Sequence, residues 1–144
     1  MSRQVIKYRS GFKYQLVEDY TVETGIEGFS VGHPFFTLTA LGDLTINAGY
    51  AWDGASGPAL DTNNFMRPSL VHDCGYQMMG EGLLPRSTRK EWDLLLRAHC
   101  LQDGMTKARA WWVYRAVRFG GDGYGRKPKQ IKLAPKRRTT RNTP

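Results

Sequence analysis

The 144-residue sequence has no long apolar run. No stretch approaches the roughly 18 apolar residues that a membrane-spanning helix needs. The first nine residues also lack the apolar segment of a secretory signal peptide. These two absences predict a protein without a transmembrane segment that stays inside its cell, or leaves it by lysis or within a larger particle.

Cysteine is scarce, with two residues, Cys74 and Cys100. A disulfide-rich scaffold of a small secreted domain needs more. We expect two buried thiols on helices, and a single bridge between those helices stays open.

Acidic residues are absent from the C-terminal end. Residues 126–144 hold eight of the 21 basic residues and no Asp or Glu, so residues 1–125 are balanced with 13 basic and 13 acidic residues. The sequence thus predicts a neutral globular domain over 1–125 and a basic, flexible tail over 126–144. Such a tail attracts nucleic acid, anionic lipid or an acidic partner without sequence-specific recognition, or serves only to keep the chain in solution.

The N-terminal third has the pattern of β-structure. Phe12–Thr24 is rich in Tyr, Val and Leu, and Phe35–Leu41 and Leu44–Ala48 flank the dipeptide Gly42-Asp43. That dipeptide predicts a hairpin with a two-residue turn. Leu44–Ala48 alternates between apolar and polar residues, which is typical of a half-buried strand.

Helical patterns occupy the rest of the domain. After a loop over 49–67, rich in Gly, Asp and Asn, we expect helices over Pro68–Met79, Thr88–Asp103 and Thr106–Phe119. Pro68 suits the first turn of a helix. The second helix opens with Thr88-Arg89-Lys90-Glu91, the pattern of a capping box. Strands followed by three helices predict an α+β domain in which the first two helices form an antiparallel pair.

The third predicted helix carries Trp111, Trp112, Tyr114 and Val117. Aromatic residues at helical spacing are typical of a core or an interface. We therefore expect one of these roles, and not a cofactor-binding motif.

A His–Asp pair is the main candidate for chemistry. His72, Tyr76 and Met79 share one face of their helix, because they are spaced i, i+4 and i+7. Asp93 flanks the apolar face of the next helix, and an antiparallel arrangement would turn it towards His72. A carboxylate on one ring nitrogen fixes the tautomer of a histidine and makes it more basic, so that the other nitrogen can take a proton from water. A His–Asp pair with a purely structural role remains the alternative.

A cation site is the second candidate. Asp73 lies one step round the helix from His72, and the loop over 52–57 supplies Asp53 and backbone carbonyls. Calcium prefers oxygen ligands of this kind. A cation there would polarise a substrate carbonyl and stabilise the oxyanion.

Three segments together resemble the phage-encoded domain of unknown function 1353 family. They are residues 49–58 (GYAWDGASGP), residues 69–76 (SLVHDCGY) and the dipeptide Trp92-Asp93. The resemblance covers about residues 5–120. It implies a bacteriophage or prophage origin, hence the bacterial host cytoplasm or a virion as the location, and it implies no particular activity.

A shorter region is similar to the bacterial and fungal type of secreted phospholipase A2. Asp53-Gly54, the segment His72-Asp73-Cys74-Gly75-Tyr76 and Asp93 stand in that family's order, with a suitable 21-residue step from His72 to Asp93. The similarity spans about 45 residues. Three features depart from the family: the missing signal and disulfides, Cys74 at an aromatic position, and the β-like N-terminal third.

The phospholipase resemblance implies a role for each matching residue. His72 would be the base, Asp93 its orienting partner, and Tyr76 a hydrogen-bond donor to the dyad. The implied calcium ligands are Asp53, Asp73 and the carbonyl of Gly54.

Two functions follow from these patterns. The first is a calcium-assisted hydrolase of lipid esters that acts on anionic membrane lipid when the phage enters or lyses its host. The second is a non-catalytic virion protein of the tail, connector or capsid, whose basic C-terminal tail contacts other virion proteins or DNA. A metal-dependent phosphohydrolase using His33 fits less well, because His33 adjoins a β-like run. A Ser56 nucleophile also fits less well, because no strand-to-helix turn is evident around it.

Overall fold

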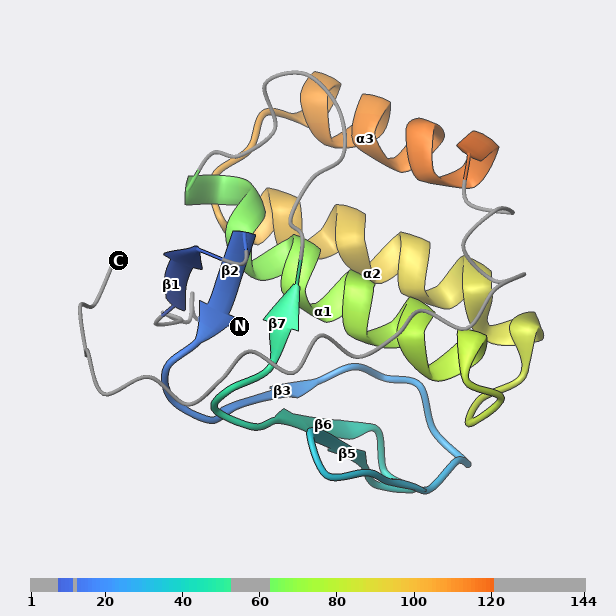
Figure 1. Cartoon of the computed structure of the whole chain (residues 1–144). Coiled ribbons are helices and arrows are strands. Elements are labelled where there is room, and N and C mark those ends of the chain that lie inside the picture. Colours follow the sequence, from blue (N-terminus) through green and yellow to red (C-terminus); the bar gives the residue numbers. More distant parts are fainter. Residues whose placement is uncertain (1–7, 12, 53–62, 121–144) are drawn as a thin grey trace. The chain divides into compact units, whose positions relative to one another are not determined.

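The computed structural model describes residues 8–11, 13–52 and 63–120, and Figure 1 shows the arrangement of its elements. By their contacts, the described residues up to Trp52 form a strand unit, and residues 63–120 form a helical unit. Strands followed by helices confirm the predicted α+β fold. The tail predicted over 126–144 lies outside the described residues.

The strand unit contains two antiparallel sheets. The first has the order β1-β2-β7 and consists of β1 (Tyr8–Gly11), β2 (Lys13–Leu16) and β7 (Ala51–Trp52). The second has the order β3-β6-β5-β4 and consists of β3 (Tyr20–Glu23), β4 (Val31–Gly32), β5 (Phe36–Leu38) and β6 (Asp43–Ile46). Apolar residues alternate with polar ones in β3 and β5, so each strand buries one of its two faces.

The β5–β6 hairpin forms where the sequence predicts it, but its turn differs. Leu44 and Ile46 are fully buried, as the alternation indicates. The predicted two-residue turn Gly42-Asp43 is wrong, because Asp43 is already the first residue of β6. Gly42 has φ +92° and closes a longer loop by donating its N–H to the carbonyl of Thr39 at 2.9 Å. A glycine adopts this left-handed conformation without steric cost.

The helical unit consists of three helices and a short 3-10 turn. They are α1 (Asn63–Gly80), the turn Arg86–Thr88, α2 (Arg89–Gln102) and α3 (Lys107–Gly120). Figure 1 shows α2 between α1 and α3. The contacts Arg67–Asp103 and Tyr76–Arg89 run in opposite directions along α1 and α2, so this pair is antiparallel. Among the described residues, no helix combines the length and the apolar character that crossing a membrane requires.

The start of α1 corrects the predicted boundary. The helix begins at Asn63 and contains Pro68 in its second turn, whereas the sequence predicts a loop over 49–67 and a helix from Pro68. Proline cannot donate to the carbonyl four residues earlier, here that of Asn64. Burial offsets this lost bond, because every residue from Phe65 to Gly75 except Asp73 is buried.

The start of α2 is predicted at the correct residue but with the wrong cap. Thr88 precedes the helix, yet its side chain caps no backbone N–H. The Thr88 hydroxyl donates instead to the carbonyl of Pro85 at 2.8 Å. The reason is the 3-10 turn, which already holds Thr88 in a helical conformation with φ −82° and ψ −2°.

Packing between the helices fixes the site described below. The core between α2, α3 and the start of α1 consists of Phe65, Leu96, Cys100, Met105, Ala110 and Val113, with Val117 at its margin. At the α1–α2 contact, a Cβ atom on Gly75 would collide with the indole of Trp92. Glycine therefore allows the close approach that brings His72 and Asp93 together. Cys74 and Cys100 are both buried and free, as expected.

Candidate functional site

The structure brings His72 and Asp93 into direct contact. Nε2 of His72 on α1 lies 2.7 Å from Oδ1 of Asp93 on α2. The Asp93 side chain is 0% exposed, whereas the His72 side chain retains 9% exposure. The buried partner is therefore the carboxylate, and the imidazole keeps a small solvent-facing part.

Asp93 is held by three hydrogen-bond donors. Besides His72, the Tyr76 hydroxyl donates to Oδ1 at 2.6 Å, and Arg118 Nη1 donates to Oδ2 at 2.9 Å. Burial alone would raise the pKa of Asp93, but the hydrogen bonds from His72, Tyr76 and Arg118 outweigh burial and lower it. Asp93 is therefore an ionised carboxylate at neutral pH.

The ionised carboxylate determines the tautomer of His72. Because the Asp93 oxygens can only accept, the hydrogen on the imidazole is assigned to Nε2 from the hydrogen-bond network. Nδ1 is then the lone-pair nitrogen of the neutral ring. The ring also packs on Tyr76, with centroids 4.2 Å apart and planes tilted by 37°. Hydrogen bond and ring contact together fix the orientation of the imidazole.

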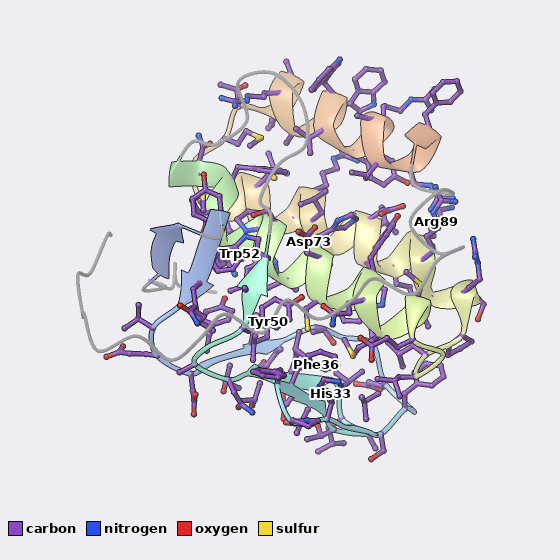
Figure 2. The ribbon with its side chains drawn as sticks, viewed as in Figure 1. His33, Phe36, Tyr50, Trp52, Asp73 and Arg89 are labelled. Carbon is purple, nitrogen blue, oxygen red and sulfur yellow. The ribbon has the colours of Figure 1, made fainter. Side chains whose placement is uncertain are left out.

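Arg89 and Arg118 extend the network to α3. Arg89 Nε donates to the Tyr76 hydroxyl at 3.2 Å, and Arg89 Nη2 donates to the carbonyls of Val117 and Arg118 at 3.2 and 2.7 Å. Figure 2 labels Arg89 at the start of α2. Burial first, and then the contact with Asp93, raises the pKa of Tyr76, so its phenol remains a donor.

Sequence reasoning missed both arginines. They are two of the 21 basic residues and carry no motif. The available signal was weak: Arg118 lies in the last turn of a predicted helix, and Arg89 lies beside the predicted cap. Their contacts join residues 13 to 29 positions apart, and these depend on how α3 packs.

Asp73 is the described member of the predicted calcium site. It follows His72 in α1 and is partly buried, and Figure 2 labels it. Asp53 and Gly54 lie outside the described residues. Within residues 8–11, 13–52 and 63–120, no group of three or more His, Cys, Asp or Glu side chains is arranged to hold a metal ion. Calcium takes about six to eight oxygen ligands, so one described carboxylate leaves this site a prediction.

His33 has a structural environment of its own in the strand unit. Its ring stacks on Phe36 with centroids 4.1 Å apart, and its Nδ1 accepts a hydrogen bond from the Phe35 N–H at 3.1 Å. Figure 2 shows His33 beside Phe36. A ring held in this way is explained by local packing. The other minor candidate, Ser56, lies outside the described residues.

The aromatic residues of α3 are mostly outside the core. Trp111 and Trp112 are 52% and 51% exposed, Tyr114 is partly buried, and Val117 packs against the core. Trp111 and Trp112 are therefore not core residues, and of the two expected roles an interface remains for them.

Comparison with known proteins adds no relative: no family model, no curated protein and no solved structure matches the chain. The two family resemblances drawn from the motifs therefore stay predictions.

Proposed function

We propose that the protein hydrolyses carboxylic esters, with lipid esters as the substrate class, and that His72 is the general base. The observation that carries this proposal is the 2.7 Å contact between His72 Nε2 and a fully buried, ionised Asp93. A buried carboxylate that orients an imidazole and stabilises its protonated form is the arrangement that general-base hydrolysis requires.

The reaction follows from the tautomer. Nδ1 of His72 takes a proton from water while the water oxygen bonds to the ester carbonyl carbon. The resulting imidazolium is stabilised by Asp93 through Nε2. When the tetrahedral intermediate collapses, the bond to the alkoxy oxygen breaks, and the departing alcohol takes the proton back from Nδ1. The products are a carboxylic acid and an alcohol, and His72 returns to its neutral form.

Calcium is part of the proposal through Asp73, Asp53 and the Gly54 carbonyl. A bound Ca²⁺ would supply positive charge for the oxyanion that forms on the carbonyl oxygen. The chain itself would contribute carboxylate and backbone carbonyl oxygens, which are the ligand types that hard cations prefer.

The biological setting comes from the resemblance to the phage family. We infer a bacteriophage-encoded enzyme that acts on anionic membrane lipid when the phage enters or lyses its host. The alternative is a non-catalytic virion component of the tail, connector or capsid. One observation favours it: three donors on one buried carboxylate would also serve to pin α1, α2 and α3 together.

Fatty-acid release from phosphatidylglycerol vesicles tests the proposal. We expect release by the full-length protein with CaCl₂ and none with EDTA. His72→Gln removes the base and Asp93→Asn removes the orienting charge, so each should lower the rate by about 10³-fold or more. His33→Gln is the matched control, since this histidine is bound within the strand unit, and it should keep the wild-type rate.

Two results would contradict hydrolysis. One is a wild-type protein that releases no fatty acid in the presence of calcium. The other is His72→Gln with undiminished release although circular dichroism shows it folded. Phage that carry His72→Gln, remain fully infective and contain the protein in purified particles would support the virion component.

A further inference from the structure

The outer face of α3 combines exposed aromatic rings with positive charge. Trp111 and Trp112 are about half exposed, at 52% and 51%, and Phe119 is 95% exposed. Figure 2 shows side chains of α3 projecting on the side away from α2. Tryptophan and phenylalanine are costly to leave in water, so a face of this kind marks an interaction surface.

Helical spacing places these rings on one side. Ala108, Trp112 and Phe119 follow each other at intervals of four and seven residues, and Trp111 and Ala116 flank them. The opposite side of α3 is formed by Ala110, Val113 and Val117, which pack against the core. The helix is therefore apolar on two sides, and the core accounts for only one of them.

The charges of α3 have a single sign. The helix contains one lysine and three arginines, and no Asp or Glu. Lys107 and Arg115 are exposed on the same side as the rings, and the Arg115 guanidinium lies over the Trp111 ring at 5.6 Å. A cation over an indole is an attractive contact, and tryptophan is enriched where proteins meet the membrane–water interface.

We propose that this face of α3, which we call the aromatic face (Lys107, Ala108, Trp111, Trp112, Arg115, Ala116 and Phe119), binds an anionic lipid surface. The rings would enter the boundary between headgroups and acyl chains, and Lys107 and Arg115 would meet lipid phosphates. A single helix with rings along its outer side can lie in a planar interface. Single-stranded nucleic acid is instead bound along concave grooves.

This inference rests on the proposed lipid hydrolysis, to which it adds the surface by which the enzyme reaches its substrate. The connection in the structure is direct, because Arg118 of the same helix donates to Asp93. Arg89 also holds the carbonyls of Val117 and Arg118 at the end of α3. The helix that carries the aromatic face therefore also carries Arg118, which binds the carboxylate of the dyad.

The test is co-sedimentation of the full-length protein with phosphatidylglycerol vesicles. The triple variant Trp111→Ala, Trp112→Ala, Phe119→Ala keeps the net charge and changes only exposed rings. We expect its partition coefficient to fall at least about tenfold. Leu94→Ala is the matched control, since Leu94 is 43% exposed on α2, and it should bind like the wild type.

High salt distinguishes the contribution of the rings to vesicle binding from that of the basic tail. In 0.5 M NaCl, attraction between the tail over 126–144 and the vesicles is screened, because the Debye length falls to roughly 4 Å. The difference between wild type and triple variant should persist there. Brominated lipids provide a second measurement: they should quench wild-type tryptophan fluorescence, and Trp111→Phe with Trp112→Phe should remove the quenching while Trp52 and Trp92 remain.

Three outcomes would overturn the inference. In the first, the wild-type protein does not bind the vesicles, and in the second, the triple variant binds as tightly as the wild type in high salt. In the third, ultracentrifugation shows a self-association that the triple variant abolishes without any change in vesicle binding. The last outcome would identify a second copy of the chain as the occupant. Binding that needs the rings but is accompanied by no fatty-acid release would support the aromatic face and contradict the hydrolysis.

Discussion

The α1–α2 pair contains two buried aspartates, Asp103 and Asp93, which differ in the side chains that bind them. At one end, Arg67 binds Asp103 through two hydrogen bonds of 3.0 and 2.9 Å, and it also binds Gln102 at 3.0 Å. Further along the pair, Asp93 is bound by one arginine, one tyrosine and one histidine. The first cluster joins an always-charged guanidinium to a carboxylate. The second includes an imidazole, whose neutral ring carries one donor and one acceptor nitrogen.

The two histidines of the pair show the same contrast. His72 has its Nε2 on Asp93, whereas His99 is 0% exposed and neither ring nitrogen finds a hydrogen-bond partner among the described residues. Burial, and then the charge of Arg67, lowers the pKa of His99 to about 3. A histidine becomes a usable base through an oriented carboxylate and a small opening to solvent. Burial alone makes it a neutral packing residue.

The largest expected loss of stability comes from removing the arginine that binds Asp103. Arg67→Met leaves Asp103 buried without its cation, and loss of one partner of a buried ion pair costs about 3–5 kcal/mol. Both side chains are almost fully buried, at 2% and 4% exposure. Arg118→Met is the matched change at Asp93. It should cost only about 1–2 kcal/mol, because the Arg118 side chain is 30% exposed and Asp93 keeps two other donors.

Urea unfolding at pH 7 measures both variants. If Arg118→Met were as unstable as Arg67→Met, the proposed difference in stability between the Asp103 and Asp93 clusters would be wrong. That result would make Asp93 a second structural clamp and weaken the case for a reactive dyad.

The second effect concerns pH and His99. Its folded pKa of about 3 lies below the ordinary value of 6.5, so the unfolded chain binds the proton first. Protonation therefore favours unfolding, and stability is lost as the pH falls below about 6.5. Between pH 7 and pH 5 this loss amounts to about 2 kcal/mol. The depressed pKa of Asp93 acts at lower pH, because its contribution is lost only below the ordinary carboxyl range near 4.

His99→Leu removes this titration. We expect the urea midpoint of the variant to be nearly constant from pH 7 to pH 5, while that of the wild type declines. The same decline in both proteins would show that another group is responsible.

The sequence predicts the inner part of the candidate site and misses its outer part. Helical spacing and an antiparallel pair are sufficient to bring His72, Tyr76 and Asp93 together, because each relation is local to one helix or to one helix pair. Arg89 and Arg118 depend on the packing of a third helix, which no local pattern specifies.

The misplaced boundaries have a related cause. Pro68 carries a strong local preference for the first turn of a helix, and tertiary burial of the preceding turn overrides it. In the hairpin, Gly42 was correctly expected at the turn, but the loop that precedes it is longer than two residues. Local preferences located these elements, and long-range packing determined where they begin.

The smallest expected effect comes from removing the Tyr76 hydroxyl while keeping its ring. Tyr76→Phe keeps the ring beside His72 but removes the 2.6 Å donor to Asp93 and the acceptor for Arg89. His72 and Arg118 still hold the carboxylate, so we expect a loss of about 1–2 kcal/mol in stability and about tenfold in fatty-acid release. Tyr114→Phe is the control, since the Arg97 guanidinium lies over that ring at 5.9 Å, one turn along α2 from Asp93, and the Tyr114 hydroxyl makes no hydrogen bond to His72 or Asp93 within the described residues. If the two variants released fatty acid at equal rates, the Tyr76 hydroxyl would have no part in orienting Asp93. Arg118 would then be the remaining residue that supports the His72–Asp93 dyad.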